Sequence, residues 1–376
     1  MSVSNIATAR RSVLSLLLAV VLPTSAVLCT SVCWATNQAT QDVLDSPAMR
    51  ASHPERSVFI DLARAGNRLV AVGERGQVLL SDDNGQRWRQ AQVPVSVGLT
   101  AVQFVDAEHG WAVGHAGVVL VTRDGGETWA RQLDGHQAAR LELEAAQRER
   151  TGSVDEEAAE VRVQTAERLV QEGADKPFLA LAFTDANHGL VVGAYGLAFR
   201  TEDGGATWNS ILGAIDNPTG LHLYAVARQG ESWFLAGEQG YLARSEDGQH
   251  FRQLESPYSG TFFTLVSRDD RSLLIGGLKG HAFILDASTD LVVPLPVLMP
   301  ISFSDAISLA DGRALLANQA GGIFVSVPAA PDRLIPALPP TGKPLSGVIQ
   351  AADGNLVVAG FTGLSCLSLP TLSASE

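Results

Sequence analysis

The chain has 376 residues, of which 46% are hydrophobic and 18% charged, and its formal net charge is −13. This length suffices for a large hydrophobic core, while 36 glycines and 17 prolines favour many turns over long helices. The negative charge argues against general nucleic-acid binding and against adhesion to anionic bilayers, because both require a field of Lys and Arg side chains.

Residues 1–35 are predicted to be a signal peptide. Arg10 and Arg11 precede the apolar run 13–22, and Ala35 suits the position before signal-peptidase cleavage. The run is shorter than a membrane-spanning helix requires. We therefore expect export to the periplasm, by the Sec route or by the twin-arginine route that the arginine pair leaves open.

Cleavage at that site would leave one cysteine in the mature chain. Cys29 and Cys33 would leave with the signal, and both are poor lipid-attachment sites because bulky Leu28 and Val32 precede them. The remaining Cys366 lies in an apolar strand-like stretch and is expected to be a small buried hydrophobe. No internal disulfide and no thiol metal site can then form.

A motif of apolar run, G-x-x-G and apolar run recurs seven times at nearly constant spacing. Six of the seven first positions are Gly and the other is Asn318, a residue that tolerates positive φ, so we expect a turn of that conformation there. The second glycines are Gly76, Gly117, Gly196, Gly240, Gly280, Gly321 and Gly363.

Each period divides into four short strands. In the second repeat, 99–106 alternates like a strand, 110–114 and 118–122 flank the G-x-x-G turn, and 127–133 follows a polar turn. Four antiparallel strands every ~42 residues are typical of a propeller blade. The sequence predicts an all-β, seven-bladed β-propeller, with each blade running from inner strand A to outer strand D.

The propeller is predicted to occupy residues 57–370, with a C-terminal tail at 371–376. The last repeat ends before a fourth strand. The N-terminal segment 36–56 could supply that strand and close the ring, since an open propeller leaves unpaired edges.

One gap between glycines measures 79 residues and contains helical sequence. We predict a helical hairpin at 134–176, inserted between blades 2 and 3, with 11 acidic and 6 basic residues. Ala159, Val163, Ala166 and Val170 form its apolar stripe, at helical spacing. Because D→A and B→C connections share one face of a propeller, the hairpin should lie on the face of the G-x-x-G turns.

A second repeated element, [ST]-x-D-x-G-x-x-W, falls at the C→D turns. It is the Asp box, or bacterial neuraminidase repeat, whose hydroxyl and carboxylate can accept turn N–H groups while the Trp ring packs against strands. We expect a structural role and no catalysis. The residues concerned are Ser81, Asp83, Gly85, Trp88, Thr122, Asp124, Gly126, Trp129, Thr201, Asp203, Gly205 and Trp208.

Two histidines and three arginines are candidates for binding. His109 and His188, near Asp106 and Asp185, stand at A→B turns of adjacent blades; a hydrogen-bonded turn is preferred over a metal site there, so no metal or cofactor is expected. At one level of the A strands stand Arg64, Arg228 and Arg268. Three guanidiniums near the channel mouth could bind a carboxylate or an acidic peptide; the alternative is that each points into solvent.

The seven repeats, F-x-D-x-x-H-G-W-A-V-G and R-D-G-G-x-T-W together resemble the photosystem II stability/assembly factor-like family of exported propellers. The resemblance covers 57–370 and is strongest over blades 1 to 4. It implies a non-enzymatic accessory protein that docks on a membrane complex through arginines. In photosynthetic relatives that complex is photosystem II and the compartment the thylakoid lumen; elsewhere it is another envelope complex.

Three functional hypotheses follow from these features. The first is a non-catalytic assembly, stability or scaffold factor, expected to be monomeric, for a membrane protein complex. The second is a sialidase-like glycosidase, which needs an arginine triad and a Tyr nucleophile on one face; Tyr195 lies in a G-x-x-G turn, on the face opposite the arginines. The third is a carbohydrate- or peptide-binding propeller.

Overall fold

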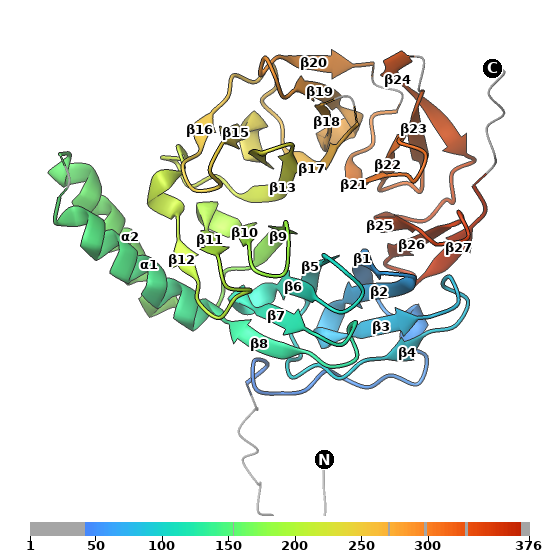
Figure 1. Cartoon of the computed structure of the whole chain (residues 1–376), viewed down its shortest axis with the longest axis horizontal. Helices are drawn as coiled ribbons and strands as arrows, with labels where there is room; N and C mark the ends of the chain where they lie inside the picture. Colours follow the sequence, from blue (N-terminus) through green and yellow to red (C-terminus); the bar gives the residue numbers. More distant parts are fainter. Residues whose placement is uncertain (1–41, 153, 270, 297–298, 328–329, 370–376) are drawn as a thin grey trace, which may run out of the picture. The chain divides into compact units, whose positions relative to one another are not determined.

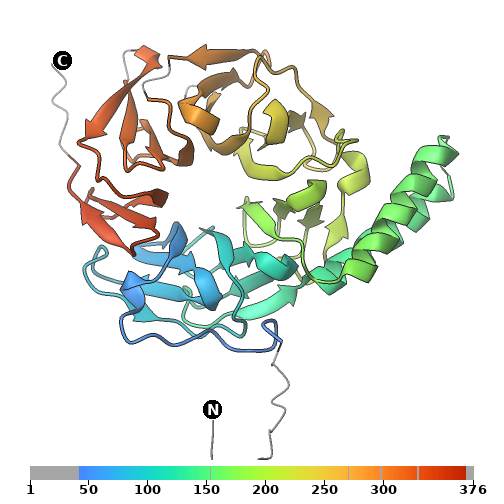
Figure 2. The same ribbon diagram turned by 180° about the vertical axis from the view of Figure 1, so that it is seen from behind.

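The computed structural model describes residues 42–152, 154–269, 271–296, 299–327 and 330–369. The predicted signal peptide and the tail 371–376 lie outside these residues. Within them, the strands form six four-stranded sheets and one three-stranded sheet, arranged as blades around a common axis (Figures 1 and 2). The predicted seven-bladed β-propeller with a helical hairpin between blades 2 and 3 is confirmed.

Each blade is an antiparallel sheet whose strands follow one another in chain order. Blade 1 comprises β1 (Phe59–Ala65), β2 (Arg68–Gly73), β3 (Val78–Ser81) and β4 (Arg89–Gln90), and blade 2 comprises β5 (Leu99–Phe104), β6 (Gly110–Gly114), β7 (Val119–Thr122) and β8 (Ala130–Leu133). Blade 3 comprises β9 (Phe178–Phe183), β10 (Gly189–Gly193), β11 (Ala198–Thr201) and β12 (Asn209–Ser210). Blade 4 comprises β13 (Leu223–Gln229), β14 (Ser232–Gly237), β15 (Leu242–Ser245) and β16 (Arg252–Gln253).

Blades 5 to 7 continue the same order, and blade 7 has three strands. Blade 5 comprises β17 (Phe262–Ser267), β18 (Ser272–Gly277), β19 (Ala282–Asp286) and β20 (Val292–Leu295), and blade 6 comprises β21 (Phe303–Ser308), β22 (Ala314–Asn318), β23 (Ile323–Val327) and β24 (Ala330–Leu338). Blade 7 comprises β25 (Leu345–Gln350), β26 (Leu356–Gly360) and β27 (Ser365–Leu367).

The hydrophobic core is divided among the junctions between neighbouring blades. Strands buried on both faces, such as β6 and β10, supply side chains alternately to the core before the blade and to the core after it. The junction of blades 7 and 1 has its own core, in which Phe59, Leu69 and Leu79 pack with Val357. Burial of large apolar surfaces between sheets is the main stabilising term for the ring.

The segment before blade 1, which was expected to add a fourth strand to blade 7, lies mostly elsewhere in the described residues. Residues 42–56 contribute no described strand to blade 7. The first part of the segment lies along blades 1 and 2, where Val43 O accepts from Ser96 N at 2.8 Å and Val93 O accepts from Ala48 N at 3.0 Å, and only its end reaches blade 7. Leu44 is buried in the core between those blades, which holds the segment there. Among the described residues, blade 7 meets blade 1 by sheet packing, without an added strand.

Two hydrogen bonds from blade 7, one to blade 1 and one to the segment before it, support this closure. Ser346 Oγ in blade 7 donates to Phe59 O in blade 1 at 2.6 Å. Leu364 N donates to Glu55 O at 3.0 Å. Cys366 does not form part of the core: it is exposed on β27, which no further strand in the described part of the chain covers, and its Sγ lies 3.4 Å from Gly85 O.

Glycine is favoured at the first and second positions of the G-x-x-G turn for different structural reasons. A Cβ on Gly73 would lie 2.1 Å from Val58 O, so the first position is Gly because inner and second strands approach closely. Gly76, at the second position, has φ of 71°, which Gly adopts without strain. The prediction of a positive φ at Asn318 is wrong, because the backbone φ of that residue is not positive. Asn318 Oδ1 instead accepts a hydrogen bond from Gly322 N at 2.7 Å.

The hairpin consists of α1 (Gly135–Arg150) and α2 (Glu156–Glu172). Asp134 and Asp155 cap the helices by accepting backbone N–H groups of their first turns, at 3.0 and 2.9 Å. A Cβ on Gly117 would lie 2.6 Å from Gly135 Cα, so α1 begins beside a G-x-x-G turn, as predicted. Val163 and Ala166 are buried against α1, whereas Val170 is 38% exposed. No helix in the described residues is long and apolar enough to cross a membrane.

Two aspartates occupy equivalent inner-strand positions in blades 1 and 6. Asp61 accepts from Leu62 N and from Val102 N of blade 2, at 2.7 and 2.8 Å. Asp305 accepts from its own strand and from Val348 N of blade 7, at 2.7 Å each. Burial raises the pKa of Asp61 to about 6, and burial together with the charge of Asp61 raises the pKa of Asp305 well above its usual value.

This pair should make stability depend on pH. A raised native pKa means that the folded state binds the proton more tightly than the unfolded chain does. The resulting stabilisation is complete below about pH 4 and is lost as pH rises through about 6. In Asp61→Asn, the fall in the free energy of unfolding between these pH values should shrink by roughly 3 kcal/mol, measured by urea unfolding.

The control is Glu74→Gln, which removes an exposed carboxylate from blade 1. Its curve of unfolding free energy against pH should parallel that of the unaltered chain. Equal slopes for Asp61→Asn and the unaltered chain would show that the pair does not titrate as described.

Candidate functional site

The three Asp boxes share one hydrogen-bond pattern. In blade 2, Thr122 Oγ1 accepts from Gly126 N at 3.0 Å and Asp124 Oδ1 accepts from Thr128 N at 3.0 Å. Trp129 is buried between blades 1 and 2, and its Nε1 donates to Gly126 O at 2.9 Å. The corresponding hydroxyls, carboxylates and glycines in blades 1 and 3 are Ser81, Asp83 and Gly85, and Thr201, Asp203 and Gly205.

The tryptophans of these turns fill inter-blade space. Trp88 packs partly buried in the core between blades 7 and 1, and Trp208 is buried in the core between blades 2 and 3. Trp88 Nε1 donates to Gly85 O at 3.0 Å. The side chains of the boxes are therefore engaged with their own turns and cores, which supports a structural role.

The two turn histidines are bonded within their own turns. His109 Nδ1 lies 2.9 Å from Asp106 Oδ2, and His188 Nδ1 lies 2.9 Å from Asp185 Oδ2. Burial of Asp185 opposes ionisation, but the N–H groups and ring of the turn outweigh it and lower the pKa of that carboxyl to about 2. Among the described residues no group of three or more His, Cys, Asp or Glu could hold a metal ion.

The three candidate arginines are spread over the ring. Arg64 is in β1, while Arg228 and Arg268 are at the ends of β13 and β17, in the neighbouring blades 4 and 5 on the far side (Figure 1). Arg64 donates to Gly66 O at 3.2 and 3.1 Å. Arg228 is ion-paired with Glu231 at 2.6 Å, and Arg268 is 9% exposed.

Only the blade 4 and blade 5 arginines are joined. Ser267 Oγ donates to Arg228 O at 2.6 Å, and Gln229 Nε2 donates to Arg268 O at 2.9 Å. The structure thus places two arginines side by side and the third across the axis.

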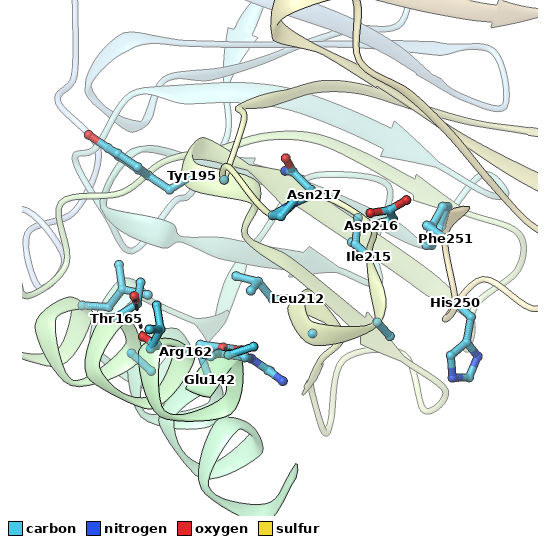
Figure 3. Close-up of a pocket in the computed structure, with 18 of the residues that line it drawn as sticks. Glu142, Arg162, Thr165, Tyr195, Leu212, Ile215, Asp216, Asn217, His250 and Phe251 are labelled. Atoms are coloured by element: carbon cyan, nitrogen blue, oxygen red, sulfur yellow. Dashed lines mark hydrogen bonds and ion pairs between the residues drawn. The ribbon is translucent and has the colours of Figure 1, made fainter. Parts of the chain in front are cut away.

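A groove of about 1650 Å³ lies between α2 and the outer parts of blades 3 and 4 (Figure 3). Leu212, Ile215 and Phe251 line it from the blades, and Val161 and Thr165 line it from α2. Its size exceeds the roughly 300–1,000 Å³ of most small-molecule pockets. The sequence predicted the hairpin but not this groove, because the distance between hairpin and blade 4 follows from tertiary packing.

A buried carboxylate anchors the hairpin beside the groove. Glu142 on α1 is 1% exposed and accepts from Arg162 Nε of α2 at 2.9 Å. Ser210 Oγ of β12 also donates to Glu142. Arg162 further pairs with Glu149. One side chain therefore joins both helices to blade 3 and fixes one wall of the groove.

Comparison with known proteins shows what this propeller resembles. A family model described as photosynthesis system II assembly factor YCF48 matches residues 80–165 and 158–256. Photosystem II assembly lipoprotein Ycf48 of Synechococcus sp. (strain CC9902) is 34% identical over 70 residues, which are 19% of this chain and 21% of that protein. The match thus spans about a fifth of the relative's length.

Solved structures show the same fold. YCF48 bound to D1 peptide has a TM-score of 0.60 at 14% identity, covering 87% of this chain and 100% of that one. YCF48 from Cyanidioschyzon merolae has a TM-score of 0.56 at 14% identity, with 84% and 96% covered. The WD40 β-propeller domain of Doa1 has a TM-score of 0.57 at 11% identity, with 89% and 99% covered.

The chain is therefore an Asp-box propeller of seven blades with a helical insert. Its resemblance to the photosystem II stability/assembly factor-like family is confirmed.

Removing the anchor should loosen the hairpin. Glu142→Ala leaves half-buried Arg162 without its buried carboxylate partner, and should lower the free energy of unfolding by about 2–4 kcal/mol. Chemical unfolding followed by far-UV circular dichroism measures this.

Glu144→Ala is the control, because that carboxylate is exposed on the same helix and pairs with Arg148 only at 4.0 Å. It should change the free energy of unfolding by less than about 0.5 kcal/mol. Equal effects of the two substitutions would contradict an anchoring role for Glu142.

Proposed function

We propose that this protein is a non-catalytic, exported accessory factor that binds a membrane protein complex during its assembly or maintenance. The client would be photosystem II in a photosynthetic organism and another envelope complex otherwise. The observation that carries the proposal is the match of the assembly-factor model to residues 80–256, over blades 1 to 4 and the insert.

Two further observations support a binding role. A propeller of the same fold is known with a D1 peptide bound, which makes a peptide segment of a membrane-complex subunit a reasonable partner class. The chain also has a net charge of −13, which suits selective contact with a protein better than adhesion to anionic lipid.

The sialidase alternative receives no support from the geometry. Tyr195 is 55% exposed in a G-x-x-G turn, while Arg64 and Arg228 lie near the ends of inner strands that run towards the opposite face. A nucleophile and a carboxylate clamp must act on one sugar ring, so their separation argues against hydrolysis.

We retain Arg64, Arg228 and Arg268 as candidate partner contacts. Since Arg64 lies across the axis from the other two, a single partner would have to span the end of the ring to meet all three. For a periplasmic or lumenal protein, such a partner would be the exported portion of a membrane subunit.

Capture from solubilised membranes of the source organism tests the proposal. The purified propeller should retain specific subunits of one membrane complex, identified by mass spectrometry. Replacing Arg64 and Arg228 by Glu should reduce capture by about tenfold, because two guanidiniums become repulsive to an acidic partner.

The matched control replaces the exposed Arg56 and Arg123 by Glu, which gives the same change in net charge. Capture should then stay near that of the unaltered protein. Failure to retain any membrane subunit would refute the assembly role, and equal loss in both double variants would refute the arginine contacts.

A further inference from the structure

Three departures from repeat symmetry lie on one arc of the propeller. The helical hairpin precedes blade 3, and the groove lies between it and blades 3 and 4. At the equivalent inner-strand position only blades 4 and 5 carry aromatic residues, Tyr224 and Phe263; the others have Ile60, Thr100, Leu179, Ser304 and Ser346. Since the remaining blades fold without an aromatic residue at this position, the side chains of Tyr224 and Phe263 are not needed to form the blade itself.

Four rings form a continuous row across this arc. The Tyr195 and His222 ring centroids are 4.8 Å apart, those of His222 and Tyr224 are 6.4 Å apart, and those of Tyr224 and Phe263 are 5.4 Å apart. Tyr195 also lines the groove, at the end away from His250 (Figure 3). The groove and the aromatic row therefore form one surface, which leads from α2 towards the inner strands.

The surface has an electrostatic preference for cations. Eight carboxylates and five cationic side chains line the groove, which is an excess of three carboxylates. Four of the cations, Arg162, Lys176, Arg244 and Arg252, are in ion pairs, and the eight carboxylates include their partners Glu142, Glu172, Asp175 and Glu246. Lys176 Nζ lies 5.2 Å from the centroid of Tyr195, so a cation already sits over the first ring. Glu238 adds a carboxylate, 3.1 Å from His222 Nδ1.

The surface also offers apolar contact along its length. Val161 is 58% exposed on α2, with Ala158 and Thr165 exposed one turn to either side. Leu212 lies on the blade side of the groove, opposite Thr165 of α2 (Figure 3), and Ile215, mostly buried in the core between blades 3 and 4, also lines the groove. With 17 residues, α2 is about 25 Å long, which is enough to accompany several turns of a partner helix.

We propose that the groove and the aromatic row bind a basic, amphipathic segment of a partner protein. Its apolar side chains pack against Val161, Leu212 and Ile215, and its Lys or Arg side chains meet the carboxylates and the faces of Tyr195 and the neighbouring rings. The proposal rests on the proposed function only for the source of the segment, a subunit of the client complex; binding of a probe peptide is measured independently of that complex.

The probe is a fluorescein-labelled helical peptide of roughly 14 residues, built from Leu and Lys at amphipathic spacing, about 21 Å long. Its counterpart carries Glu in place of each Lys. Fluorescence anisotropy with the full folded protein, at about 0.15 M salt, should show binding of the Lys peptide and none of the Glu peptide.

Two matched pairs of variants locate the site. Tyr195→Ala should weaken binding about fivefold or more, whereas Phe361→Ala should leave it unchanged; Phe361 is 63% exposed in the equivalent turn of blade 7. Glu238→Gln should weaken binding roughly threefold, whereas Glu74→Gln, at the equivalent position of blade 1, should not. Thermal unfolding of all four variants confirms folding.

Loss confined to Tyr195→Ala and Glu238→Gln establishes the site. Equal loss within each pair would show that the peptide is attracted by overall charge alone and would overturn the proposal. Absence of Lys-peptide binding, or preference for the Glu peptide, would also overturn it. Failure of membrane capture with intact peptide binding would refute the assembly role and leave the groove proposal standing.

Discussion

The packing of each blade's face against the next blade is the constraint on which the rest of the structure depends. Every junction has its own hydrophobic core, and the last junction is closed by the same packing, with Phe59 and Leu69 of blade 1 against Val357 of blade 7. In the described residues no added strand closes the ring, and the hydrogen bond between Ser346 and Phe59 and the close approach of Gly347 to Ile60 O join the inner strands of blades 7 and 1. The Asp boxes and buried aspartates act at these same junctions.

Sequence periodicity predicted most of this architecture. The seven G-x-x-G turns, four strands per repeat and the hairpin could be read from local patterns, since turns and helix caps depend on residues close in the chain. The position of residues 42–56, the exposure of Cys366 and the conformation of Asn318 could not. Each depends on how close two blades or two strands come, which short-range patterns do not encode.

The candidate site shows the same division. Its structural members, such as Thr122 and Trp129, were predictable because the Asp box is one local turn. The sequence predicted that Arg64, Arg228 and Arg268 occupy equivalent positions near the ends of their inner strands. It did not predict that Arg64 lies across the propeller axis from the other two, which argues against a single arginine cluster. The groove and its row of rings required the hairpin's position, although aromatic residues at repeat positions that are otherwise aliphatic or hydroxylated were a signal in the sequence.

We propose that repeated residues stabilise the propeller and that non-repeated residues, chiefly on blades 3 to 5, contact the partner. Photo-crosslinking tests this most directly: a photoreactive amino acid is placed at Tyr195 or at Phe361 in the full chain, which is irradiated with solubilised membranes. The account predicts a discrete crosslinked product from position 195 and none from position 361. Equal products from both positions, or a product from 361 alone, would contradict it.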